Sequence, residues 1–130
     1  MSKVPSHKEL QAVAALDGPQ RYAHTVKRAA DGALLWGLYD GGWVSSADET
    51  GEPAFPVWPR SEYAALCAVD AWAGSTPRQI PVHDFLEEIV PNLVEGGSKV
   101  AVFATAAGSV MLVPAEQFAR DLIDELSRLE

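Results

Sequence analysis

Trp36-Gly37-Leu38-Tyr39-Asp40-Gly41-Gly42-Trp43 is the stretch that predicts the most about the fold of this chain. The apolar run from Ala33 to Tyr39 predicts a β-strand. Asp40-Gly41-Gly42 predicts a hairpin turn after it, because glycine readily adopts the positive φ that tight hairpins need. We expect a return strand from Trp43 to Ser46, so that the stretch forms a β-hairpin.

All four tryptophans of the chain lie at Trp36, Trp43, Trp58 and Trp72. A tryptophan ring is large and its N–H needs a hydrogen-bond partner when it is buried. If Gly41 and Gly42 form a two-residue loop, Trp43 lies opposite Asp40, and Trp36 and Trp43 share one face of the hairpin with Leu38. We expect Trp36 and Trp72 to pack in the core. Trp43 and Trp58 lie at the ends of elements, and there they could form an exposed aromatic surface.

The remaining pattern mixes helices and strands without regular alternation. Helical spacing of apolar residues and capping signals predict helices at about 6–16, 19–30, 61–73, 83–95 and 115–129. Further strands are expected at 54–58, 79–82, 100–103 and 110–113, the last two joined through Ala107-Gly108. The order ααβββαβαββα predicts an α+β fold with a mixed sheet of five or six strands packed with about five helices.

Capping signals place the ends of several of these helices. Ser6 to Glu9 has the S-x-x-E form of a capping box. Asp17 or Gly18 caps the second helix, in which Pro19 occupies the first turn. Pro91 is expected to break or kink the helix at 83–95. The length fits a single domain over 1–130, with a helical pair at 1–31 and an α+β body at 32–130.

Charge is unevenly distributed along the chain and restricts the possible partners. The net charge is −8; residues 1–31 sum to +2 and residues 32–130 sum to −10. An acidic body repels phosphate backbones, so we expect no binding to nucleic acid. A basic protein partner suits this charge.

No apolar run reaches the length of a membrane helix, and the first residues lack the apolar part of a secretion signal. We therefore expect a soluble cytoplasmic protein that does not insert into a membrane.

No familiar catalytic or metal-binding motif occurs in the sequence. His7, His24 and His83 are too widely spaced for a zinc motif, so no metal and no cofactor is expected. Cys67 is the single cysteine, which excludes an internal disulfide, and it lies in the most apolar predicted helix. A cysteine in such a helix behaves as a small hydrophobic residue, and we expect no nucleophilic role for it.

Asp70 is the most unusual charge, because its neighbours in the predicted apolar helix are Leu66, Cys67 and Trp72. A buried carboxylate must find a partner or stay neutral. Arg60 and Arg78 flank the helix and could supply the partner. The alternative is a perturbed acid beside a cleft.

The tryptophan blocks also carry a resemblance to a known family. Trp36-Gly37-Leu38, Asp40-Gly41-Gly42-Trp43 and Pro56-Val57-Trp58-Pro59, with Trp72, Asp84-Phe85-Leu86 and the run from Val100 to Phe103, resemble a family of small bacterial proteins of unknown function. The resemblance spans roughly 19–127 and implies no particular activity. From Phe55 onward the element order is also similar to the N-terminal domain of the enhanced-serine-sensitivity and type III secretion chaperone-like family, which implies binding or regulation.

These observations favour a non-catalytic protein-binding module of the immunity or adaptor type. Its surface would combine the hairpin, the corner at Trp58-Pro59-Arg60 and the acidic residues near Asp48, Glu49, Glu52, Glu87 and Glu88. The candidate binding residues are Tyr39, Asp40, Trp43, Trp58, Arg60 and Asp70.

Two alternatives stay open. One is a regulatory or enzymatic domain that holds a small molecule in a pocket lined by Tyr39, Trp43 and Trp58, with Asp70 or Arg60 as its polar group. The other is a homodimer that pairs through an apolar strand edge or through the corner at Trp58.

Overall fold

The helices and strands follow one another in the predicted order in the computed structural model, which describes residues 6–47, 51–105 and 110–129. The helices are α1 (His7–Ala14), α2 (Gly18–Gly32), α3 (Ser61–Leu66), α4 (Val82–Asp84), α5 (Val90–Glu95) and α6 (Ala115–Arg128). A 3-10 turn η1 (Asp70–Trp72) follows α3, and a π-helical turn η2 (Phe85–Ile89) joins α4 to α5. The strands are β1 (Leu34–Tyr39), β2 (Ser46–Ala47), β3 (Pro53–Val57), β4 (Thr76–Pro81), β5 (Lys99–Val102) and β6 (Met111–Pro114). The predicted α+β class is confirmed, while Asp48, Glu49 and the turn at Ala107-Gly108 lie outside the described residues.

The predicted caps of the first two helices are confirmed. The Ser6 side chain accepts a hydrogen bond from the Glu9 backbone N–H at 3.1 Å, and the Asp17 carboxylate accepts one from the Gln20 N–H at 2.8 Å. Each bond satisfies a backbone donor that has no partner inside the helix. At its other end α2 continues to Gly32, and Ala33 adopts the left-handed conformation that usually falls to glycine.

Six strands are present, but they form two sheets instead of the single mixed sheet that we expected. One sheet has the order β2-β3-β5-β6, in which β3 and β5 are parallel and the other pairs are antiparallel; the second is the antiparallel pair β1-β4. An isolated bridge links the sheets: the Trp36 N–H donates to the Trp58 carbonyl at 2.9 Å, and the Trp58 N–H donates to the Trp36 carbonyl at 2.8 Å. β3 thus meets β2 near its start and β1 just beyond its end, which divides the expected sheet in two.

The predicted return strand at 43–46 is wrong. Trp43 makes only an isolated bridge with Tyr39, and the partner of β1 is β4. The reason is the length of the loop. Three residues separate Tyr39 from Trp43, and the Asp40 N–H donates to the Gly42 carbonyl at 2.9 Å. The two-residue turn that we predicted would have placed Trp43 opposite Asp40, one position further along β1.

The predicted apolar helix at 61–73 ends early. α3 stops at Leu66, and Asp70 has a φ of 52°, which a right-handed helix cannot accommodate. Leu66 and Val69 are 57% and 53% exposed. The segment is therefore not buried on all sides, and its apolar character alone was a misleading sign of helix.

Of the break or kink predicted at Pro91, the break does not form, because the chain stays helical from Val82 to Glu95. Proline lacks the N–H that the preceding turn of an α-helix would use. Here the π-helical turn η2 comes directly before Val90 and Pro91, so the widened turn accommodates the proline within a continuous helix.

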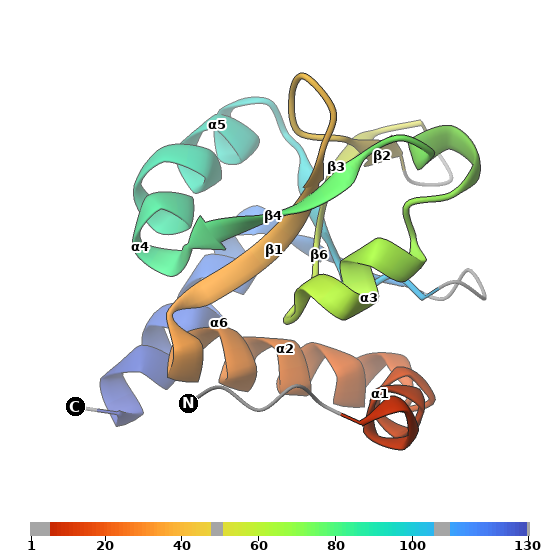
Figure 1. Cartoon of the computed structure of the whole chain (residues 1–130). Coiled ribbons are helices and arrows are strands. Elements are labelled where there is room, and N and C mark those ends of the chain that lie inside the picture. The colour runs from red at the N-terminus through yellow and green to blue at the C-terminus, as the bar shows by residue number, and fades with distance from the viewer. Residues whose placement is uncertain (1–5, 48–50, 106–109, 130) are drawn as a thin grey trace.

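Helices cover the sheets from two sides. In Figure 1, α1, α2 and α6 lie below the strands and α4 and α5 lie to their left. The core between them is rich in rings and branched side chains, and its largest fully buried members are Trp58, Phe85, Phe103, Phe118, Leu35 and Leu38. α2 is joined to α6 by the Tyr22 hydroxyl, which donates a hydrogen bond to Asp121. Across the described ranges, none of the helices combines the length and the apolar character that a membrane span requires.

Candidate functional site

Two aromatic rings and a guanidinium group form a compact cluster at the predicted hairpin. The Trp43 ring lies edge-on to Tyr39, with 5.2 Å between the ring centroids and 85° between the planes. The Cζ atom of Arg78 lies 4.3 Å from the Tyr39 centroid and 5.9 Å from the Trp43 centroid. At these distances the negative ring faces attract the cation. We refer to Tyr39, Trp43 and Arg78 as the hairpin cluster.

Gly37 makes room for this cluster. It lies opposite Arg78 in the β1–β4 register, and a Cβ atom at this position would come within 3.0 Å of the Trp43 ring. Trp43 therefore covers the face of β1 on which Gly37 lies. Because side chains alternate along a strand, Trp36 and Leu38 point to the opposite face. The expectation that these two residues share a face with Trp43 is wrong, and the one-residue shift in the loop explains it.

Ring contacts connect the hairpin cluster to the core. The centroid of Trp43 lies 6.0 Å from that of Phe55, and Phe55 lies 6.3 Å from Phe85 in η2. Phe85 is fully buried and Trp43 is half-buried, whereas the Arg78 side chain is exposed. The rings are thus held from below, while the guanidinium group faces solvent.

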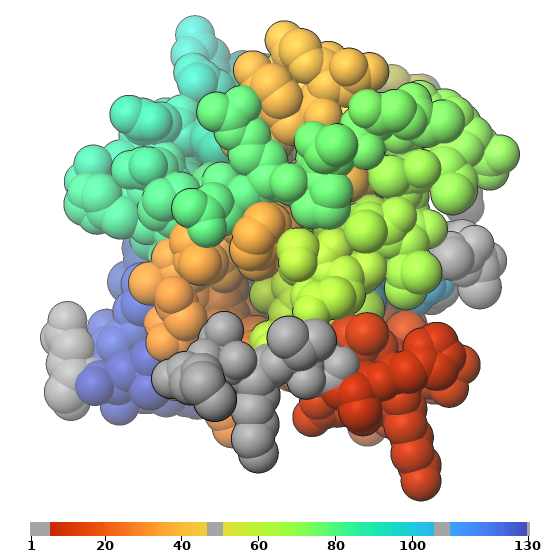
Figure 2. Space-filling view, viewed as in Figure 1, coloured from red at the N-terminus to blue at the C-terminus, as the bar shows by residue number. Residues whose placement is uncertain are grey.

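Acidic side chains lie in the hairpin turn and along the helix from Val82 to Glu95. Asp40 is exposed in the turn between Tyr39 and Trp43. The continuous helix from Val82 to Glu95 contains no lysine or arginine, and it exposes four carboxylates, those of Asp84, Glu87, Glu88 and Glu95. Figure 2 shows the hairpin tip (orange) and the last turns of this helix (cyan) projecting at the same end of the protein. The helix begins beside Leu34, at the other end of β1 from the hairpin, so Asp40 and the last turns of the helix are the acidic segments nearest the cation of the hairpin cluster.

Trp58 does not belong to this surface. Its side chain is completely buried, its Nε1–H donates to the Ala104 carbonyl at 2.9 Å, and its ring lies edge-on to Trp72 at 5.9 Å. Pro59 is buried as well. The exposed corner that we expected at Trp58-Pro59-Arg60 is therefore not formed, because Trp58 continues β3 into the core between β5 and the bridge to Trp36.

Arg60 and Asp70 also lie apart from the hairpin cluster. Arg60 is half-buried at the start of α3 and lies close to His24 and Arg28. Burial, and then the charges of Arg28 and Arg60, lower the pKa of His24 below its usual value. Asp70 is exposed in η1, so the expectation of a buried acid is wrong: α3 ends before it, and the left-handed turn carries its side chain to the surface.

The structure brings together Tyr39, Asp40 and Trp43 from the predicted set, and it adds Arg78, which the sequence analysis considered only as a partner for Asp70. The prolines at positions 77 and 81 of β4 indicate an edge strand, where an arginine remains exposed. The pairing of that strand with β1 connects distant parts of the chain. No local pattern predicts it.

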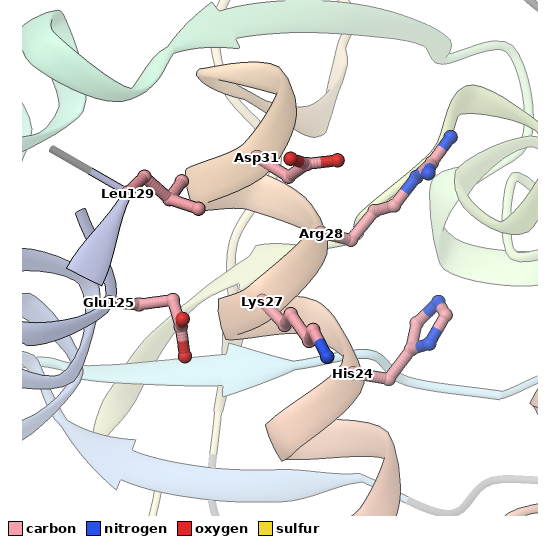
Figure 3. A pocket seen from close by; sticks show the side chains of 6 residues that line it. All are labelled: His24, Lys27, Arg28, Asp31, Glu125 and Leu129. Atoms are coloured by element: carbon pink, nitrogen blue, oxygen red, sulfur yellow. The ribbon is translucent and has the colours of Figure 1, made fainter.

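A pocket of about 290 Å³ lies between α2 and α6 (Figure 3). It is lined by His24, Lys27, Arg28, Asp31, Glu125 and Leu129. In Figure 3, His24 and Arg28 extend away from α6, and the Asp31 carboxylate points away from Leu129. The lining includes two cations and two carboxylates, and burial, with the charges of Arg28 and Arg60, lowers the pKa of His24, which disfavours its charged form. The pocket therefore does not select an ion of either sign.

Among the described residues, tryptophan lines neither this pocket nor the pockets beside α1 and beside Tyr22. Within residues 6–47, 51–105 and 110–129, no three histidine, cysteine or acidic side chains come together in a way that could hold a metal ion. The strongest candidate site is therefore the hairpin cluster with its acidic surroundings.

Comparison with known proteins gives a family but no activity. The family model described as "Protein of unknown function (DUF2750)" matches residues 22–122. No curated protein and no solved structure matches the chain. The likeness to the enhanced-serine-sensitivity domain and the assignment of the tryptophan blocks as the family's motifs are not confirmed by these comparisons and stay predictions.

Proposed function

We propose that this chain, which belongs to the DUF2750 family of proteins of unknown function, is a non-catalytic module that binds a basic protein partner. The observation that carries the proposal is the hairpin cluster. Its guanidinium group lies 4.3 Å from the Tyr39 centroid on an exposed edge strand.

Arginine and large aromatic residues contribute most of the energy at many protein interfaces. A side chain that is free in solution loses rotamer freedom when a partner binds. The rings of Tyr39 and Trp43 already restrict Arg78, so less freedom remains to be lost. The exposed guanidinium donors can then bind carbonyl or carboxylate oxygens of the partner.

The surrounding charge supports a basic partner. The chain carries a net charge of −8, the exposed carboxylate of Asp40 lies in the hairpin turn, and the last turns of the acidic helix at 82–95 project at the same end. Complementary charge speeds association and excludes partners of the wrong sign. An immunity-type or adaptor protein of the bacterial cytoplasm fits this pattern.

Affinity capture with matched variants tests the proposal. The tagged full chain is used as bait in a lysate of its own cells, beside Arg78→Ala and beside Arg120→Ala, which removes an exposed arginine from α6. We expect one stoichiometric basic protein that is retained by Arg120→Ala, lost with Arg78→Ala and released by added salt.

Two results would contradict the proposal. One is a partner that binds Arg78→Ala and the unchanged chain equally well. The other is a bait that retains no protein at low salt. Melting curves of the three baits show that the variants are folded, so that a lost partner reports on the surface and not on stability.

A further inference from the structure

A second pocket, of about 360 Å³, is lined by residues of α1, of α3 and of the segment that follows β5. In Figure 1, α3 lies between β4 and α1. Most of its wall comes from Ala14, Ala15, Leu66, Cys67, Phe103 and Ala104. Among the described residues that line it, none carries a charge. This is unusual in a chain that contains 28 charged side chains.

Short side chains keep the pocket open on the α1 side. Ala14 and Ala15 face α3 from the last turn of α1 and leave space that a longer residue would fill. On the other side Leu66 lines the pocket while 57% of it remains exposed to solvent. An exposed leucine beside an apolar hollow is a surface that favours an apolar ligand.

The back wall of the pocket is rigid. Phe103 has a φ of 53°, a strained conformation for an aromatic residue, and the Arg21 Nε–H donates to its carbonyl at 3.4 Å. The next carbonyl, that of Ala104, accepts hydrogen bonds from Trp58 Nε1 at 2.9 Å and from Cys67 Sγ at 3.2 Å. Three side chains thus hold two consecutive peptide groups in place, so the wall is formed before any ligand arrives.

We propose that this pocket binds an uncharged, mainly apolar small molecule. Pockets that hold small molecules are mostly apolar and roughly 300–1,000 Å³ in volume, and the apolar lining and the volume of this pocket fit that description. A charged ligand would lose its hydration without a charged partner. Gln11 and Thr105 also line the pocket and can bind a polar substituent.

The site is separate from the proposed protein-binding surface, and its failure would leave that proposal standing. A side chain inserted by a protein partner is the competing occupant. An absence of saturable binding by a small neutral probe would favour that occupant, because an inserted side chain is held in place by the rest of its own protein.

Titration of the full chain with N-phenyl-1-naphthylamine tests the proposal, because this neutral probe fluoresces strongly only in apolar surroundings. Ala14→Phe places a ring in the pocket, and Ala12→Phe adds the same ring to an exposed position of the same helix that does not line the pocket. We expect saturable one-to-one binding to the unchanged chain and to Ala12→Phe, and an affinity lower by about tenfold or more for Ala14→Phe.

Cys67 locates the bound probe without a mutation, because it lines the pocket and is the single cysteine of the chain. Saturating probe is expected to slow the modification of Cys67 by methyl methanethiosulfonate several-fold. The proposal is overturned by an absence of saturable binding, by equal affinities of Ala12→Phe and Ala14→Phe, or by a modification rate that the probe leaves unchanged.

Discussion

Trp43 and Trp58 were both expected at an exposed aromatic surface, yet the structure uses them in opposite ways. Trp43 lies half-buried over Gly37, with Arg78 and Tyr39 beside it. Trp58 is fully buried, and its N–H is bound to the Ala104 carbonyl. One ring supports a surface and the other holds the core together.

Strand pairing explains this difference better than local sequence does. Trp58 directly follows β3, which has β5 along one side, and its backbone is bonded to that of Trp36. Trp43 follows a loop, and its only ladder contact is the isolated bridge to Tyr39. A ring next to a central strand is enclosed by neighbouring strands and helices, whereas a ring beside a turn at the edge of a sheet keeps one side in water.

The largest expected effect comes from removing the buried ring. Trp58→Ala should lower the free energy of unfolding by about 3–5 kcal/mol, because it opens a cavity and removes a donor from the Ala104 carbonyl. Urea denaturation followed by far-UV circular dichroism measures this loss. Trp43→Ala is the matched change and should cost clearly less, since Trp43 is only half-buried. Equal losses for the two variants would remove the distinction between them.

A smaller change at Gly37 tests whether the hairpin cluster depends on close packing. An added Cβ would meet Trp43 ring carbons at 3.0 and 3.1 Å, so Gly37→Ala must displace the ring. We expect a loss of about 1–3 kcal/mol and a shifted indole N–H resonance of Trp43. Gly42→Ala is the control, because no atom lies within 4 Å of the corresponding Cβ position. An unmoved Trp43 resonance in Gly37→Ala would show that the ring is not held against the strand.

The order of the elements could be predicted from the sequence because it depends on local signals. Ser6 and Asp17 cap their helices as expected, and the apolar runs at 100–103 and 110–113 correspond to β5 and β6. Each of these features is decided within a few residues by capping, turn residues or apolar runs.

The candidate site could be predicted only in part, because half of its geometry is long-range. The hairpin turn places Tyr39 beside Trp43, and the sequence shows this turn. The third member, Arg78, joins the cluster because β4 pairs with β1. No pattern in the residues around Arg78 predicts that pairing. The error at Asp70 has a similar origin: apolar composition suggested a buried helix, whereas the surroundings leave Leu66 and Val69 more than half exposed.

Removing the cation should affect binding far more than stability. The Arg78 side chain is exposed, so Arg78→Ala should lower the free energy of unfolding by less than about 1 kcal/mol. Thermal melts measured beside Arg120→Ala check this expectation. A loss as large as that of Gly37→Ala would make Arg78 part of the folding core, and the hairpin cluster would then no longer contrast with the region around Trp58.

The pH dependence of Cys67 should give the smallest effect and tests the buried side of the comparison. Burial raises the pKa of its thiol above the ordinary value of 9.0, although its hydrogen bonding with Trp58 acts in the opposite direction. The folded state therefore holds the proton more tightly than the unfolded state does. This contribution to stability is complete below pH 9 and is lost as the pH rises from there through the folded pKa.

Alkylation by iodoacetamide, which needs the thiolate, should accordingly be slower in the folded chain than in urea and should reach its midpoint at a higher pH. In Trp58→Phe, studied at a temperature at which it remains folded, the hydrogen bond from the indole is absent and the midpoint should rise further. A folded chain that reacts at the pH of free cysteine would show that water reaches the wall behind Trp58, and the region around it would then be as open as the hairpin.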